Sequence, residues 1–371
     1  MAGAKGYSSY RGRGSGWKIL IAVVLVLVIV VAVSVIYMQQ YLVYNADGRW
    51  QIDLPWQSEK EDAPPPAEDP ENDPLAGMDV VVQEPEAPEL QDTVAFCIPA
   101  QPLRQSVWGE YSDLAFSDRS SGTYNAVVVR LKTSNGTIYF DSANAVSGAV
   151  EVVNEPGEDP AETAITLGLI TSREGVHTIA SMSCLQDFKA ANADVEGRGL
   201  KNTGGYIFYD GNNNLWLDPA KPSTREYVCA LAREIAEMGF DELLLTEFSY
   251  PTEGKIHKIN YNTEVPLANN LDLLLGDLNT ALEPYDILLS VEIPEAVITE
   301  GPDTVAGLDL SRLAGRVDRI YAATTPDQVE TLTNLVSQAA GAEGRTSFVP
   351  ELAEDSPSVT GSRLILADYL A

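Results

Sequence analysis

The sequence predicts an α/β fold, a (β/α)8 TIM-type barrel preceded by a single transmembrane helix and an acidic, proline-rich linker. Three observations lead to this prediction. After residue 92, short β-branched and apolar runs alternate with amphipathic stretches, which is typical of repeated βα units around a parallel sheet. Near the N-terminus nineteen consecutive residues carry no charge, and acids and prolines dominate between these two regions. The 371 residues leave ample length for one barrel of about 250 residues.

The large C-terminal domain, residues 93–371, holds eight candidate strands, a number that suits a closed barrel. An open doubly wound sheet is the alternative. Its nucleotide-binding versions carry a Gly-rich phosphate turn after the first strand, and the sequence has none at that place. The expected strands are Thr93–Ile98, Asn125–Lys132, His177–Cys184, Asp241–Phe248, Ile287–Ile293, Arg319–Ala323, Thr346–Val349 and Leu364–Ala367.

The best-defined βα unit spans residues 215–251. Residues 223–226 (Ser-Thr-Arg-Glu) have the pattern of a capping box, in which a hydroxyl and a carboxylate each satisfy a free backbone amide at a helix start. Apolar residues at helical spacing follow, and Gly239 is placed to end the helix in a left-handed conformation. The next strand ends in Thr246 and Glu247. Polar side chains at the carboxyl end of a barrel strand face the active-site mouth.

The N-terminal 37 residues predict a membrane anchor. Residues 19–37 are long enough, at about 1.5 Å per residue, to cross a hydrocarbon core of about 30 Å. Residues 1–18 hold four cations and no acid, so the positive-inside rule predicts a cytoplasmic tail. We therefore expect a single-pass protein of the cell membrane with an extracellular C-terminal domain. A cleaved signal peptide is the alternative, although its apolar region is usually only about 7–15 residues long.

Residues 38–92 form a short extracellular segment and a linker. Residues 44–56 place turn-forming residues (Asn-Ala-Asp-Gly) between two apolar stretches. From Ser58 to Asp92 the chain is crowded with prolines and acids, which leaves too little apolar surface to offset the entropy of folding. We expect this segment to repel itself and to extend as a stalk.

Charge and cysteine content exclude several classes of function. A net charge of −30 would repel the phosphates of nucleic acid, so we expect no nucleic-acid partner. Three cysteines allow at most one intramolecular disulfide. No spacing of residues typical of a metal site occurs, and we expect neither metal nor cofactor. With only His177 and His257, few residues are available for a Ser-His-Asp or Cys-His mechanism.

The domain resembles the putative glycoside-hydrolase barrels of bacteria, a family first described as a domain of unknown function. The resemblance covers most of residues 93–371. It implies a TIM-type barrel outside the cytoplasm that acts on a polysaccharide or related glycan. The segments that carry it are NAVVVRLKTSNGTIYFDS (125–142), LWLDPAKPSTREYVCALAREIAEMGFDELLLTEFSYP (215–251) and LSVEIP (289–294).

The sequence departs from the family pattern at three positions. After the fourth strand the family usually reads Phe-Asp-Tyr-x-Arg-Phe-Pro, and this chain has Thr246 in place of the Asp and Ser249 in place of the Arg. The second strand usually carries an Asp where this chain has Arg130. Two of the three departures, Thr246 and Arg130, remove a carboxylate of the family pattern.

Other family positions keep their chemistry. Glu292 stands where the fifth strand of the family has Asp, and Glu351 stands near the end of the seventh strand. Each keeps a carboxylate on a longer side chain. Asp187 matches a family Asp after the third strand, and Lys132 also matches.

Cleavage of a glycoside generally needs two carboxyl groups that flank one bond. Glu292 is the first candidate for the proton donor, because burial at a strand end favours the protonated form. Its partner is one of Glu247, Glu351 and Asp187. Glu247 points inward only if the strand's alternation is broken at its end. Arg130 is expected to neutralise one of these acids and to contact substrate.

Candidate substrate-binding residues are mostly aromatic, because sugar rings pack their apolar faces on aromatic rings. The resemblance adds Lys132 and Thr246, and His257 follows the fourth strand. The aromatic candidates are Trp108, Tyr111, Tyr206, Tyr209 and Tyr250.

Two classes of function remain open. The first is a membrane-tethered glycoside hydrolase that acts on a cell-envelope or extracellular polysaccharide by carboxylate acid/base chemistry. The second is a barrel of the same ancestry that binds glycan without cleaving it, because the family's Asp positions at Thr246 and Arg130 are lost. A purely structural role in a larger membrane assembly is a third alternative.

Overall fold

The computed structural model describes residues 42–44, 50–52, 90–116, 124–154, 161–261, 263–341 and 344–366. The chain divides into two compact units, residues 1–86 and 87–371. In the first unit, β1 (Leu42–Tyr44) pairs antiparallel with β2 (Trp50–Ile52). The predicted membrane helix, residues 19–37, lies outside the described residues. No helix within those residues combines the length and the apolar character needed to cross a membrane.

The second unit is built on a closed barrel of eight parallel strands, as the sequence predicts. Around the barrel the strands follow the order β10-β11-β12-β3-β4-β5-β7-β9, and each contacts two parallel neighbours. The strands are β3 (Val94–Ile98), β4 (Ala126–Lys132), β5 (His177–Ser183), β7 (Glu242–Thr246), β9 (Leu288–Glu292), β10 (Arg319–Ala323), β11 (Ser347–Leu352) and β12 (Arg363–Ile365).

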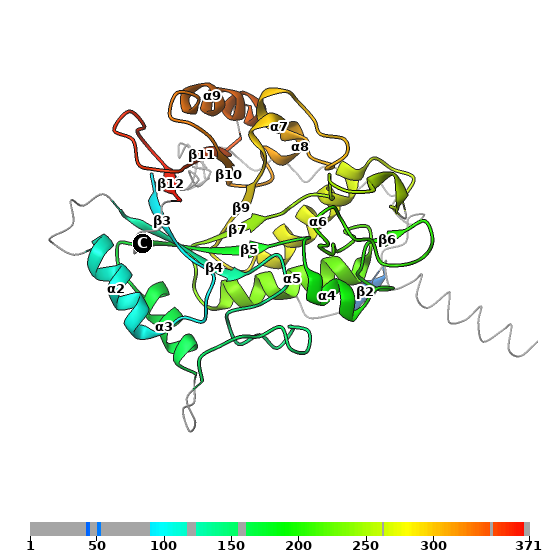
Figure 1. Ribbon diagram of the computed structural model, residues 1–371, viewed down its shortest axis with the longest axis horizontal. Coiled ribbons are helices and arrows are strands. Elements are labelled where there is room, and N and C mark those ends of the chain that lie inside the picture. The colour runs from blue at the N-terminus through cyan, green and yellow to red at the C-terminus, as the bar shows by residue number, and fades with distance from the viewer. Residues whose placement is uncertain are drawn as a thin grey trace, which may run out of the picture. The chain divides into compact units, whose positions relative to one another are not determined.

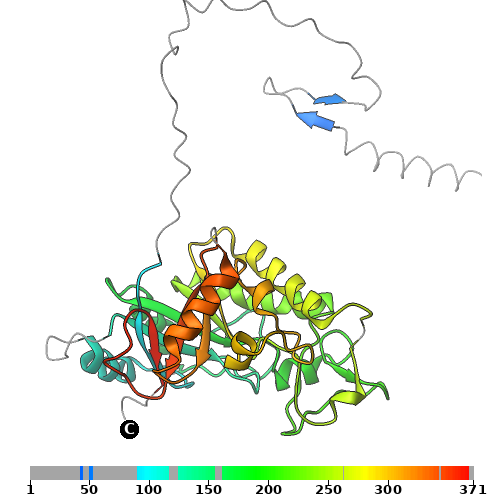
Figure 2. The ribbon, with the colours of Figure 1, turned by 90° about the horizontal axis from the view of Figure 1, so that it is seen from above.

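Helices connect consecutive strands from β3 to β11 and lie outside the barrel, and a loop without a helix joins β11 to β12 (Figures 1 and 2). Two short strands, β6 (Lys201–Asn202) and β8 (Ile259–Asn260), pair antiparallel in the loops that follow β5 and β7. The helices are α2 (Gln105–Phe116), α3 (Glu162–Thr171), α4 (Phe188–Ala193), α5 (Pro222–Glu237), the 3-10 helix η1 (Ile256–Lys258), α6 (Leu267–Leu282), α7 (Glu295–Thr299), α8 (Leu310–Leu313) and α9 (Val329–Ala340).

Helix α5 begins two residues earlier than a capping box that starts at Ser223 implies. Its N-cap is Lys221 and it makes no side-chain capping bond, so the box at residues 223–226 does not cap the helix. Pro222 occupies the first turn, where its fixed φ angle favours helix and its missing N–H is no loss. The predicted end is correct, because Gly239 follows the helix with φ +83°.

Two large apolar clusters fill most of the described domain, and a third, small one consists of Leu352, Val359 and Ile365. The largest lies between the strands and the surrounding helices. The second takes alternate residues from the strands and fills the inside of the barrel, since successive side chains of a strand point to opposite faces. Its members are Ala95, Ala126, Val128, Ile179, Leu244, Tyr321, Val349 and Leu364, with Cys97 packed against it. This plug divides the barrel interior into two ends.

Candidate active site

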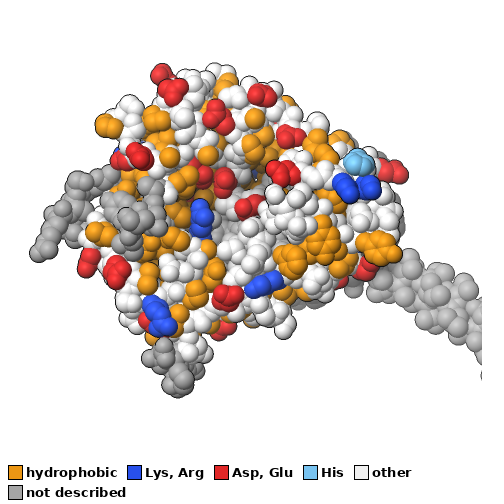
Figure 3. Space-filling view, in the orientation of Figure 1, with side chains coloured by type: hydrophobic (Ala, Val, Ile, Leu, Met, Phe, Trp, Pro, Cys, Tyr) orange, Lys and Arg blue, Asp and Glu red, His pale blue; other side chains and the backbone are white. Residues whose placement is uncertain are grey.

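Five polar or ionisable side chains point into the barrel at the carboxyl ends of its strands. Each stands two positions after an interior residue: Arg130 follows Val128, Thr246 follows Leu244, and Glu351 follows Val349. The same alternation brings in Cys97 on β3 and Glu292 on β9. We refer to this end of the barrel as the mouth. Figure 3 shows Asp and Glu side chains gathered around a Lys or Arg side chain near the middle of one face.

Glu292 and Glu351 are the central pair of the mouth. They stand on β9 and β11, with β10 between them, in register with Tyr321 and Ala323. Burial raises the pKa of Glu351 to about 8, and the charge of Glu292 adds to that rise. Burial and the charge of Glu247 raise the pKa of Glu292. Because each carboxylate disfavours ionisation of the next, the mouth retains a proton at neutral pH.

Glu247 joins this group through an unusual backbone conformation. Strand alternation would point it away from the mouth, but β7 ends at Thr246 and Glu247 has φ +46°. A left-handed conformation is costly for a residue with a Cβ and is concentrated at functional sites. The Thr246 hydroxyl donates a hydrogen bond to Glu247 Oε2. The broken alternation that Glu247 needs to face the mouth is therefore present.

A cavity of about 240 Å³ opens between the ends of β7, β9 and β10. Glu247 and Glu292 both line it, together with Ser249 and Glu295. Glu295 accepts a hydrogen bond of 2.8 Å from Thr324 Oγ1. The cavity therefore offers acceptors and donors for sugar hydroxyls beside two carboxyl groups.

Arg130 is the cation of the mouth. Its positive charge opposes the upward pKa shifts of both Glu292 and Glu351. Its side chain also hydrogen-bonds Cys97, whose thiol pKa is nevertheless raised by burial. The Arg that replaces the family's Asp thus lies among the carboxylates, where it partly balances their charge.

Asp187 is held in a buried ion pair with Lys132. Its carboxylate is fully buried, lies 2.9 Å from Lys132 Nζ, and accepts a 2.7 Å bond from the Ala190 amide at the start of α4. The Tyr227 hydroxyl donates a third bond to it, at 3.3 Å. Lys132 also donates to the Ser183 carbonyl at 2.6 Å, because a bulge in β4 turns it toward β5. These contacts hold the loop after β5 to the barrel.

The predicted aromatic residues fall into two groups. Trp108 and Tyr111 are buried in the core on α2. Tyr250 is 1% exposed and accepts a bond of 2.9 Å from Asn270 Nδ2. None of these three rings presents a face to solvent. The remaining two, Tyr206 and Tyr209, are exposed, and so is His257 on η1.

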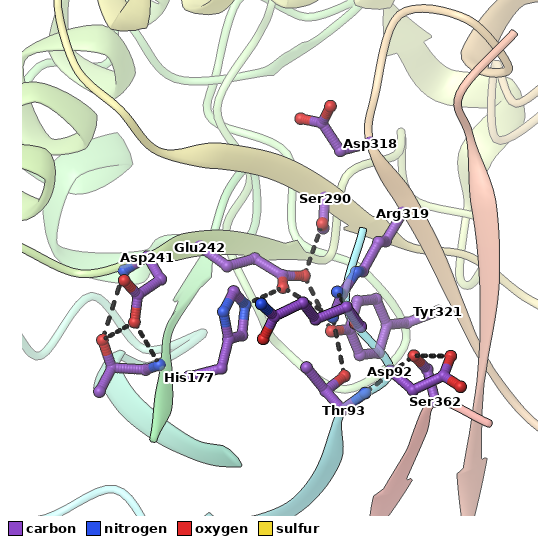
Figure 4. Close-up of polar contacts among 12 residues, drawn as sticks. Asp92, Thr93, His177, Asp241, Glu242, Ser290, Asp318, Arg319, Tyr321 and Ser362 are labelled. Atoms are coloured by element: carbon purple, nitrogen blue, oxygen red, sulfur yellow. Dashed lines mark hydrogen bonds and ion pairs between the residues drawn. The ribbon is translucent and has the colours of Figure 1, made fainter. Parts of the chain in front are cut away.

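A second polar cluster lies at the other end of the barrel, which we call the base. Glu242 is fully buried there and receives four contacts (Figure 4). Its partners are His177 Nε2 at 2.8 Å, Ser290 Oγ at 2.6 Å, the Tyr321 hydroxyl at 2.8 Å and Arg319 Nη1 at 3.2 Å. Burial alone would raise the pKa of Glu242, but the His177 bond and the Arg319 charge lower it.

This base cluster was not predicted from the sequence. Its signal was present, because Glu242, Ser290 and Arg319 are polar residues at inward-facing positions of strands that are otherwise apolar. In the described part of the chain, no group of three or more metal-ligating side chains could hold a metal ion. Cys97, Cys184 and Cys229 are free thiols.

Comparisons with known proteins agree with this architecture. The family described as "putative glycosyl hydrolase domain" matches residues 113–336, more than half of the chain. No curated protein matches the chain.

Three solved structures are similar to this chain at low identity. A hypothetical protein from Ruminiclostridium thermocellum has 21% identity over 50% of this chain and 90% of that one, with a TM-score of 0.39. The PgaB (BpsB) glycoside hydrolase domain from Bordetella bronchiseptica has 14% identity over 72% and 85%, with a TM-score of 0.47. The glycoside hydrolase domain of PelA from Pseudomonas aeruginosa has 15% identity over 70% and 83%, with a TM-score of 0.37.

Proposed function

Because the chain belongs to the family of putative glycosyl hydrolase domains, we propose that it hydrolyses O-glycosidic bonds of a cell-envelope or extracellular polysaccharide. The observation that carries the proposal is the Glu292–Glu351 pair. The two carboxyl groups enter the mouth from different strands. The charge of Glu292 adds to the raised pKa of Glu351, and burial and the charge of Glu247 raise the pKa of Glu292. A pair of carboxyl groups that divides its protons between them is the arrangement that acid/base cleavage of a glycoside requires.

The raised pKa of Glu351 supports the following roles for the two glutamates. Glu351, with the pKa raised to about 8, keeps its proton at neutral pH and donates it to the leaving glycosidic oxygen. Glu292 then acts as the carboxylate, either attacking the anomeric carbon or activating a water molecule. This reverses the role that the sequence favoured for Glu292. Arg130 favours its ionised state, and Glu247 lines the cavity beside it.

Single substitutions test this assignment. The full-length chain and its Glu351→Gln and Glu292→Gln variants are incubated with purified envelope polysaccharides, and released reducing ends are measured. Loss of either group should lower kcat by a factor of about 10²–10⁴. Glu300→Gln, an exposed glutamate at the end of α7, is the matched control and should keep full activity. Equal turnover by all four proteins would contradict the proposal.

A barrel that binds glycan without cleaving it is the second candidate. Arg130 favours it, because a cation among the carboxylates opposes the protonation that a general acid needs. In that case polysaccharide would be retained by the wild type and by Glu351→Gln alike, and no reducing ends would appear.

We also propose that residues 19–37 anchor the chain in the cell membrane, with the barrel outside the cytoplasm. The uncharged segment and the cations that precede it support this orientation. Protease added to intact cells should digest the barrel and spare the N-terminal tail. Recovery of the protein in the high-salt-soluble fraction would contradict the anchor.

A further inference from the structure

The loops that follow β5 and β7 are joined into one surface at the mouth end of the barrel. Strands β6 and β8 pair, and the Thr203 amide donates a bond of 2.8 Å to the Lys258 carbonyl. At a second place the loops touch backbone to backbone, because a Cβ on Gly254 would lie only 2.6 Å from the Gly211 nitrogen. Loops at the carboxyl ends of barrel strands form the substrate side of this fold.

Two tyrosines stand out from the first of these loops. Tyr206 is 76% exposed and Tyr209 is 49% exposed, whereas Phe208 between them is buried. Most large aromatic side chains of the domain are buried, whereas these two rings leave apolar surface exposed to solvent. Within the described parts of residues 200–214 and 252–260, they are the only large hydrophobic side chains that are exposed.

The second loop brings cations to the same surface. Lys255, His257 and Lys258 are all exposed on or beside η1. Among the described residues none of the three forms an ion pair with an acid, and Glu253 accepts a bond of 2.9 Å from Asn212 instead. This is notable in a chain with a net charge of −30. Figure 3 shows hydrophobic side chains beside Lys, Arg and His side chains over the region of β6.

At each contact between the loops, a tyrosine stands within three residues of the contact on the first loop, and a lysine stands at or next to it on the second loop. Tyr206 follows the Thr203–Lys258 bond by three residues, and Tyr209 precedes the contact between Gly211 and Gly254, next to Lys255. We propose that these five side chains, the tyrosine–lysine surface, bind a polysaccharide that carries anionic groups such as uronates. The rings offer flat apolar faces for sugars, and the cations attract the acidic groups.

The composition of the surface favours a glycan over an anionic lipid membrane. A segment that enters a lipid interface buries a broad apolar face of Leu, Phe or Trp. This surface exposes two tyrosines, and the exposed residues around it include polar ones such as Asn212 and Thr203. The binding site would lie outside the catalytic mouth and would hold a long substrate near it.

The test measures retention of the full-length chain on immobilised polygalacturonate and on its fully methyl-esterified, uncharged form. We expect the wild type to prefer the charged polymer, and the preference to fall with added salt. The double variants Tyr206→Ala/Tyr209→Ala and Lys255→Gln/Lys258→Gln should each bind at least about tenfold more weakly, which is about 1.4 kcal/mol. Only the lysine variant should also lose the salt dependence.

Matched controls use exposed residues elsewhere on the domain. Leu273→Ala on α6 and Arg345→Gln should bind as the wild type does. Glu292→Gln should also bind fully, which separates this inference from the proposed hydrolysis: binding can succeed where cleavage fails. The inference is overturned if all variants bind equally, or if the two tyrosines and lysines are needed for phosphatidylglycerol vesicles and not for polygalacturonate.

Discussion

The two ends of the barrel shift the pKa of a buried glutamate in opposite directions. At the base, Glu242 is fully buried and contacts four hydrogen-bond donors, one of them the Arg319 guanidinium. At the mouth, Glu351 is nearly as buried, and its nearest charges include another carboxylate. The pKa of Glu242 is lowered and that of Glu351 is raised to about 8. Burial is common to both sites, so the neighbours determine the direction.

This difference separates a structural acid from a chemical one. A buried carboxylate with a full set of donors is ionised at all ordinary pH values and has no proton to give. A buried carboxyl group that faces other carboxylates has a proton held close to the working pH, at a cost in stability. The direction of the pKa shift and the neighbouring groups therefore distinguish the glutamates at the two ends, although the residue type is the same.

The largest stability effect is expected from Glu242→Gln. The variant leaves Arg319 buried without its counter-charge, so the free energy of unfolding should fall by about 3–5 kcal/mol. Urea unfolding followed by circular dichroism measures it, with Glu300→Gln as control. Since the pKa of Glu242 is lowered on folding, its contribution is present above the unfolded pKa and is lost as pH falls through the folded value. A difference that does not shrink at low pH would contradict this account.

Glu351→Gln is expected to change the free energy of unfolding in the opposite direction, that is, to raise it. The folded pKa is raised, so ionisation opposes folding increasingly from the unfolded pKa of 4.5 up to about pH 8. Replacing the ionisable group removes this penalty and should stabilise the domain by about 1–3 kcal/mol at neutral pH and by almost nothing at pH 4. The same urea experiment at both pH values measures this gain. A variant less stable than the wild type at pH 7 would show that Glu351 is held by donors, as Glu242 is.

The strands were predicted from the sequence, and the polar contacts of the base cluster were not. All eight predicted strands are present, because β-branched runs bounded by polar residues have one stable arrangement in repeated βα units. The pattern also brought Glu292, Glu351 and Arg130 to one end, since parallel strands align their carboxyl ends. It did not show that Asp187 pairs with Lys132, because that contact depends on a bulge in β4. Long-range polar pairs leave no periodic signal.

A smaller effect is expected from the backbone of Glu247. Its φ of +46° strains any residue with a Cβ, and glycine relieves this strain. Glu247→Gly should therefore be more stable than Glu247→Ala by about 1 kcal/mol. Both variants lose the carboxylate and the bond from Thr246, so their difference isolates the backbone. Equal unfolding midpoints would mean that residue 247 leaves the left-handed region once its side chain is removed.

The smallest effect concerns Arg130, and it links the charges of the mouth to the rate. Hydrolysis should rise with pH as Glu292 ionises and fall near pH 8 as Glu351 loses its proton. Arg130 lowers both pKa values, so Arg130→Gln should move both limbs of the profile of kcat to higher pH, by about half a unit because the side chain is exposed and screened. Arg130→Lys keeps the charge and should leave the limbs in place. If Arg130→Gln abolished substrate binding while the limbs stayed fixed, Arg130 would be a contact for substrate and not a charge that tunes the two glutamates.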